Sequence, residues 1–329
     1  VPFVREMHEA GLIEPDDSGI PLSDFGSIDF ISRLIEAIAY RRGLGDLLAE
    51  GAAVAAEQIS GAWPIYEKYY PAHGQMEHNS VRDYPGIALF WALDSRDPMI
   101  DHHAYRHLSV TRLNWPHPHQ LTVEQAETIS KKIFGNSTAI DHLTYADKAA
   151  AIALCQNKSC VKNSLVLCDF LYPIFISQSR EDRMGDTAAE SQLFFAVTGR
   201  EISEEALDRV GERIFTLSRA IMVREGRTRA DDTLHETYFR DTEAIDSANG
   251  KGTMRVISSS EHTKAVPRDQ FEEAKTEYYR LRGWATDSGR PSRETLMALD
   301  LPDVADALHP RQTKNSTSGN HTSTRKEAP

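Results

Sequence analysis

The sequence predicts a mostly α protein made of two helical domains. Apolar residues recur at helical spacing along most of the chain, whereas convincing strand patterns with alternating polarity are scarce. The chain has 329 residues, which is enough for about two domains of ordinary size with a substantial core. Between Pro64 and Pro85 the helical spacing is interrupted by Tyr, His, Gly and Pro, so we place a domain boundary near residue 76.

The first strong helical pattern begins at Ser27, whose hydroxyl is a suitable N-cap. The apolar residues that follow share one stripe, which we expect to face the core: Ile28, Ile31, Leu34, Ile35 and Ile38. After a basic pair that suits a helix C-terminus, Gly43 and Gly45 are expected to end the helix. Residues 1–75 therefore form the first helical domain.

The second domain, residues 76–310, has its clearest helix from about Ser203 to Glu225, with Gly226 as the stop. Its expected buried stripe is Ala206, Val210, Ile214, Leu217 and Ile221. A further amphipathic helix starts at Pro267 and carries Phe271, Ala274, Tyr278 and Leu281, and a short helix starts at Pro291. Residues 311–329 contain no large apolar side chain, so we expect a disordered tail.

The composition excludes several classes of function. Lys and Arg number 37 against 49 Asp and Glu, a net charge of −12 spread along the chain, which argues against a nucleic-acid partner. The longest apolar runs fall far short of the ~20 residues of a membrane helix. Three cysteines do not make a disulfide framework and favour a reducing, cytoplasmic setting. No heptad seam is present, so the oligomeric state stays open.

The cysteines are spaced C-x4-C-x7-C, as Cys155, Cys160 and Cys168. This spacing matches neither the paired cysteines of zinc ribbons nor a local iron-sulfur loop. Each cysteine is therefore compatible with a small buried core residue. Cys168 has a second interpretation, because it ends an aliphatic segment that could hold a thiolate rigidly as a metal ligand.

Five histidines fall within eighteen residues: His102, His103, His107, His117 and His119. On a helix, His103 and His107 would share a face. Three interpretations stay open: a metal site, a histidine that transfers a proton in catalysis, and a packed or surface cluster. No H-E-x-x-H pattern supports the first of these.

The segment from Arg224 to Thr233 is a charged turn with two interpretations. Its arginines and the pair Asp231 and Asp232 either form a solvated connector of weak surface ion pairs or hold an anionic cofactor. The chain has no G-x-G-x-x-G, phosphate-loop or G-x-S-x-G signature, which excludes the commonest nucleotide-binding and hydrolase classes.

Four segments in the same order resemble the tungsten-dependent aldehyde ferredoxin oxidoreductase family: residues 39–51, 165–170, 224–234 and 277–284. Shorter segments at 80–85, 183–186 and 194–199 are similar to the branch that contains the catalytic subunit of class II benzoyl-CoA reductase. The resemblance implies a longer enzyme, of which this chain is the last two, helical domains. An N-terminal β domain and a C-x2-C-x3-C loop are then expected upstream of Val1.

The resemblance also implies cofactors and site residues. Cys168 would complete a 4Fe-4S cluster, and Asn163 and Leu167 would contact a tungsten bis-pterin (tungstopterin or molybdopterin). Asn163 occupies an acidic position of the family motif, and Val166 occupies its glycine. His102, or next to it His103, would be the proton donor or acceptor beside the substrate.

The implied activity is the oxidation of aldehydes to carboxylic acids, with ferredoxin or another redox subunit as electron acceptor. An alternative is a benzoyl-CoA reductase-like tungsten subunit that acts on an acyl thioester within a larger complex. A third interpretation, from another class, is a non-catalytic helical scaffold.

Overall fold

The computed structural model describes residues 1–67, 81–82, 84–96, 98, 103–109, 121–241 and 265–310. Within these ranges the protein is helical, and its only β contacts are two isolated bridges, Ile176 with Met184 and Trp284 with Pro291. The predicted mostly α class is confirmed. The predicted boundary near residue 76, the tail at 311–329, and the histidines His102, His117 and His119 lie outside the described residues.

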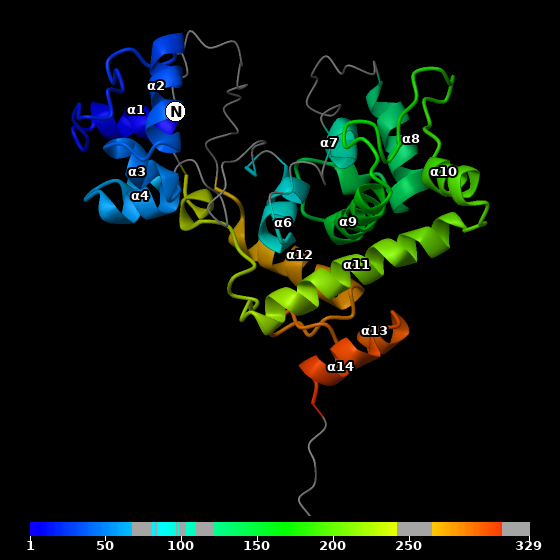
Figure 1. Ribbon diagram of the computed structural model, residues 1–329. Helices are drawn as coiled ribbons and strands as arrows, with labels where there is room; N and C mark the ends of the chain where they lie inside the picture. Colours follow the sequence, from blue (N-terminus) through cyan, green and yellow to red (C-terminus); the bar gives the residue numbers. More distant parts are fainter. Residues whose placement is uncertain are drawn as a thin grey trace, which may run out of the picture.

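The N-terminal region contains five short helices that pack on one another, and Figure 1 draws this region in blue at one side of the molecule. They are α1 (Pro2–Glu9), α2 (Ile28–Ala39), α3 (Leu44–Ala49), α4 (Ala52–Gln58) and α5 (Trp63–Glu67). Their buried side chains form a separate apolar cluster, in which Phe30 and Met7 are fully buried.

The remaining helices form a second group, in which α9 contacts α6, α7, α8, α11 and α12, whereas α14 packs on α11 and α13 (Figure 1). They are α6 (Pro85–Leu93), α7 (His103–Ser109), α8 (Val123–Phe134), α9 (Lys148–Ser164), α10 (Ala189–Thr198), α11 (Glu204–Arg224), α12 (Arg268–Leu281), α13 (Arg293–Ala298) and α14 (Pro302–Leu308), with 3-10 turns η3 (Thr138–Ile140) and η4 (Glu236–Phe239). Every residue of α6 is buried, so this helix forms the centre of the larger core.

Helix α2 begins where the sequence predicts and buries Leu34 of the predicted stripe, but the rest of its buried face is different. The Ser27 hydroxyl accepts a hydrogen bond from the Phe30 N–H at 3.0 Å, as expected of an N-cap. However, Ile28 and Ile35 are 86% and 61% exposed, whereas Phe30 is buried. The helix carries two apolar stripes, and the stripe with the aromatic ring packs inward because it buries the larger area.

Gly45 does not end α2. It lies inside α3, where a Cβ atom would come within 2.2 Å of the Ala37 carbonyl carbon, so glycine permits the close approach of α2 and α3.

Helix α11 also has the predicted bounds and a different buried face. Ser203 caps it by accepting from the Ala206 N–H at 3.1 Å. The predicted stripe is wrong, since Val210 and Ile221 are 41% and 45% exposed. The face that packs on the domain is Leu207, Gly211, Phe215, Thr216, Arg219 and Ala220. The spacing of apolar residues does not predict this buried face, because the face includes the fully buried Arg219.

The last two predicted helices are found at the expected places. Pro267 precedes α12, whose Phe271, Ala274 and Tyr278 are buried as predicted, although Leu281 is 49% exposed. Ser292 caps α13 by accepting from the Thr295 N–H. None of the helices within the described ranges has the length and apolar character needed to cross a bilayer.

Candidate functional site

The C-terminal end of α9 is a well-defined turn that leads to Cys168. The Val166 N–H donates to the Asn163 carbonyl at 3.2 Å, and the Leu167 N–H donates to the Lys162 carbonyl at 2.9 Å. These two bonds form a Schellman motif, in which Val166 takes the left-handed position with a φ of +56°. A β-branched residue is strained in this conformation, which explains why glycine suits this position of the family motif.

Replacing Val166 by glycine is expected to stabilise the protein. A left-handed conformation costs a non-glycine residue about 1–2 kcal/mol, and the greater freedom of glycine in the unfolded chain offsets about half of that gain. We expect a net increase of roughly 0.5–1 kcal/mol in the free energy of unfolding, measured by urea denaturation.

Val197→Gly is the matched control, because Val197 is also exposed, at 84% against 90% for Val166, but lies within α10 in helical conformation. There glycine should destabilise the protein. A loss of stability in both variants would contradict the strain assigned to Val166.

Cys168 is an exposed free thiol on a tightly held turn. Its own carbonyl accepts hydrogen bonds from the N–H groups of Leu171 and Tyr172, at 3.2 and 3.0 Å. The buried ammonium of Lys162 pairs with the Asp169 carboxylate at 3.3 Å, which fixes the turn to α9. The interpretation as a buried core residue holds for Cys155, which is 1% exposed, but is wrong for Cys168.

Helix α7 places two histidines next to this turn. The rings of His103 and His107 are stacked with their centroids 6.4 Å apart, as their i, i+4 spacing predicts. The ring of Phe170 also stacks on that of His103, with their centroids 4.8 Å apart. His103 is 7% exposed, although Phe170 is 72% exposed. The structure therefore brings His103 and the Cys168 turn together.

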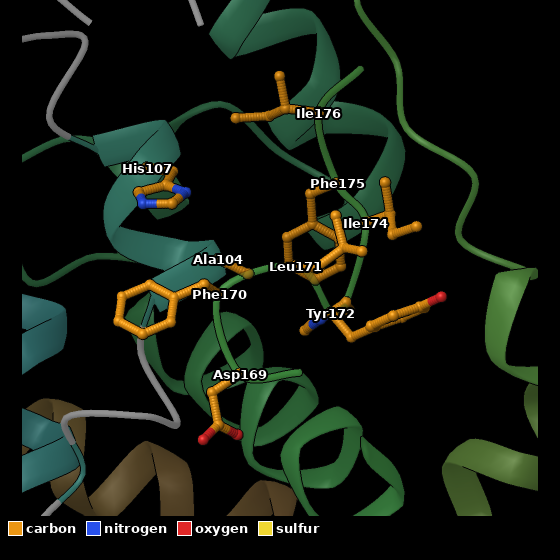
Figure 2. Close-up of a pocket in the computed structure, with 10 residues that line it drawn as sticks. Ala104, His107, Asp169, Phe170, Leu171, Tyr172, Ile174, Phe175 and Ile176 are labelled. Atoms are coloured by element: carbon orange, nitrogen blue, oxygen red, sulfur yellow. The ribbon is translucent and has the colours of Figure 1, made fainter. Parts of the chain in front are cut away.

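Figure 2 shows the shallow pocket between these two elements. Phe170 lies beside Ala104 of α7, with His107 one turn further along that helix, and the chain from Tyr172 to Ile176 closes the other side. Its volume of about 60 Å³ suits no more than a small group.

A larger cleft lies beside Asn163. It has a volume of about 420 Å³ and is lined mainly by polar side chains of α9, α11 and the segment that follows α6: Asp94, Ser95, Arg96, Gln156, Ser159, Cys160, Asn163, Ser164, Ile214, Phe215 and Ser218. The Gln156 amide donates to the Asp94 carboxylate at 2.6 Å and accepts from the Tyr278 hydroxyl at 2.6 Å. This fixed polar wall can orient a ligand that forms several hydrogen bonds.

Asp232 is neither a surface residue nor open to a cofactor. It is fully buried and accepts two hydrogen bonds from the fully buried Arg219, at 2.8 and 2.6 Å. It also accepts from Arg227 Nε at 2.7 Å and from the Tyr279 hydroxyl. Burial, together with the neighbouring Asp232 carboxylate, raises the pKa of Tyr279. Arg227 therefore pairs with Asp232 as the first sequence interpretation expected, but the pair is buried instead of solvated, and Asp232 is the centre of a structural network.

Asp231 is the exposed member of the acidic pair. It accepts hydrogen bonds from the Thr228 N–H and hydroxyl, which hold the pKa of its carboxyl below the usual value. Arg227 connects the network to the wall of the cleft, since it donates to the carbonyls of Ala92 and Asp94 at 2.7 and 3.1 Å.

The described parts of the chain contain no group of three or more His, Cys, Asp or Glu side chains placed to hold a metal ion. The exposed Cys168 thiol is compatible with a single ligand to a centre whose other ligands come from elsewhere.

Comparison with protein families matches residues 1–301 to the model described as aldehyde ferredoxin oxidoreductase, domains 2 and 3. The chain belongs to the aldehyde ferredoxin oxidoreductase family. The family is one of oxidoreductases, and the match covers the helical domains that the resemblance implied.

The chain is also similar to curated tungsten-containing aldehyde ferredoxin oxidoreductases. The chain is 26% identical over 306 residues to the tungsten-containing aldehyde ferredoxin oxidoreductase of Pyrococcus horikoshii. It is also 26% identical to those of Thermococcus kodakarensis, over 304 residues, and Pyrococcus furiosus, over 305 residues. These alignments cover 91% of this chain and 41% of each relative.

A solved structure shares the fold. The chain superimposes with a TM-score of 0.57 and 19% identity on the active site complex BamBC of benzoyl coenzyme A reductase, determined in complex with 1,5-dienoyl-CoA. The match covers 93% of this chain and 43% of that chain.

Proposed function

We propose that this chain supplies the helical domains of a tungsten-dependent enzyme that oxidises aldehydes to carboxylic acids and passes the electrons to ferredoxin or another redox subunit. The observation that carries this proposal is the position of the exposed Cys168 thiol, on a rigid turn that packs through Phe170 against His103. The family membership gives the class of chemistry, and this juxtaposition supports Cys168 and His103 as its site.

The residues at the end of α9 and in the turn that follows it fit the cofactors of the family. Cys168 would provide one thiolate to a 4Fe-4S cluster, and its exposure leaves room for ligands from another domain. Asn163, exposed at the rim of the polar cleft, and Leu167, held by the Schellman motif, would contact the pterin. When bound, these groups supply the two-electron chemistry at the carbonyl carbon and the one-electron transfer that follows.

The protein's own part is to place and protect the reacting groups. In this proposal His103 receives or donates the proton that the oxidation of a hydrated aldehyde requires. Its ring is buried under Phe170, which holds one face of the imidazole and limits access of water. His102, the other candidate, lies outside the described residues.

Replacement of Cys168 by serine tests the proposal. In the full-length protein, we expect Cys168→Ser to lose most of its cluster iron and the EPR signal of the reduced cluster, because serine cannot replace the thiolate. Cys160→Ser is the control, since Cys160 is a half-buried residue of α9 that belongs to the core and the cleft wall. Unchanged iron content and an unchanged EPR signal in Cys168→Ser would refute the ligand assignment.

A second candidate function is supported by the fold shared with benzoyl coenzyme A reductase. In that case the chain would be part of a tungsten subunit that acts on an acyl thioester in a larger complex. Assays of the full-length protein with simple aldehydes and with benzoyl thioester, each with a viologen dye, separate the two. Turnover of aldehydes alone supports the first function, and turnover of the thioester alone supports the second.

The interpretation as a non-catalytic scaffold can be tested on the gene. If the reading frame continues upstream of Val1 and encodes C-x2-C-x3-C, the scaffold interpretation is contradicted.

A further inference from the structure

Helix α10 buries its acid and exposes its apolar residues. Glu190 is 1% exposed, whereas Phe195 and Val197 are 49% and 84% exposed. A surface helix normally turns its apolar stripe inward and its charged residues to water. The orientation of α10 therefore depends on Glu190 being acceptable in the interior.

Glu190 has no hydrogen-bond partner for either carboxylate oxygen. The charged groups that face it come from the two neighbouring helices: Lys158 of α9, and Glu204 and Asp208 of α11. The Lys158 ammonium is already paired with both of those carboxylates, at 3.0 Å from Glu204 and 2.9 Å from Asp208. The cluster thus contains three carboxyl groups and one ammonium, and an ionised Glu190 would add a second uncompensated negative charge.

The electrostatic effects on Glu190 agree with this arrangement. Burial is the largest effect and raises the pKa of the Glu190 carboxyl. Its own backbone N–H and the Lys158 ammonium lower this pKa, and the negative charges of Asp208 and Glu204 raise it by smaller amounts, so that the net change is upward. Burial likewise raises the pKa of Asp208. A protonated Glu190 carries no charge and avoids most of the desolvation penalty of a buried carboxylate.

We propose that Glu190 is a proton-operated latch, which holds α10 against α9 and α11 while its carboxyl group carries a proton and releases the helix when that proton is lost. The sign follows from the proton affinities of the two states. The docked helix binds the proton more tightly than the released helix, whose carboxyl has the ordinary pKa of 4.5. Docking is therefore strongest at low pH and weakens as the pH rises from about 4.5 to the raised pKa of the docked state.

Hydrogen exchange of α10 in the full-length protein, followed by mass spectrometry between pH 5 and pH 9, tests the latch. After correction for the intrinsic exchange rate, we expect the opening constant of the peptide that covers α10 to rise up to about tenfold per pH unit within the titration window. Glu190→Gln, which is permanently uncharged, should abolish this rise. Glu201→Gln, at an exposed position just after α10, should behave like the wild type.

A measurement on the wild-type protein tests the proposal even if Glu190→Gln does not fold. The ¹³C carboxyl resonance of Glu190 should titrate with a midpoint above the ordinary pKa of 4.5. A midpoint at or below 4.5, with α10 still protected from exchange, would overturn the proposal. An equal pH dependence of α10 opening in wild type and Glu190→Gln would also overturn it. The test is independent of any enzymatic activity.

Discussion

Replacement of Asp232 by asparagine is expected to lower the free energy of unfolding by about 3–5 kcal/mol. The variant keeps the size of the side chain but leaves the fully buried guanidinium of Arg219 without its carboxylate. Arg227, whose Nε lies 2.7 Å from Asp232, loses the same partner. A fully buried cation and a partly buried one without their counter-charge are far costlier than a weakened hydrogen bond, which is why the loss should be large.

Urea denaturation followed by tryptophan fluorescence measures this effect close to its origin. Trp284 is a suitable probe, because the Arg219 guanidinium lies 5.0 Å from the centroid of its ring. Asp231→Asn is the matched control: it removes the neighbouring acid, which is exposed and bonded only to Thr228. A loss of stability in Asp232→Asn no larger than in Asp231→Asn would refute the central place of Asp232 in the network.

Replacement of His103 by asparagine is expected to lower the turnover of the full-length enzyme by about 10²–10⁴-fold, the usual contribution of a general acid or base. Asparagine cannot exchange a proton near neutral pH, but it retains a side-chain amide that hydrogen-bonds. The variant should keep its tungsten and iron, because His103 is not proposed as a ligand. Turnover with aldehyde and viologen dye, together with metal analysis, measures both expectations.

His142→Asn provides the control for this variant, since His142 lies on the loop after η3 and lines neither cavity of the candidate site. Full turnover in His103→Asn would remove this residue from the mechanism. The same substitution at His102 would then test the second candidate, for which we also expect lost turnover with tungsten retained.

Local features of the fold could be predicted from the sequence because they depend on neighbouring residues. Ser27 was predicted as an N-cap and Ser203 as the start of a helix, and both accept a hydrogen bond from the backbone N–H three residues later. The buried faces of α2 and α11 could not be predicted in the same way. In both helices more than one face is compatible with burial, and the choice depends on partners distant in the sequence.

In the candidate site, too, local features could be predicted from the sequence and contacts between distant residues could not. The spacing of His103 and His107 predicted that they share a helix face, because this is a property of one helix. Their contact with the Cys168 turn joins residues more than sixty positions apart, and no spacing rule contains it. The buried pair of Arg219 and Asp232 was also beyond prediction, since single-sequence patterns assign arginine and aspartate to the surface.

Helix α6 sets a limit on how this protein can be shortened. All nine of its residues are buried, so it has no water-facing side and relies on α9 and α12 for cover. α12 lies about 180 positions later in the chain. A polypeptide cut before α12, whether by a protease or by stalled synthesis, keeps α9 but uncovers the side of this apolar helix that α12 covers, and is prone to aggregate.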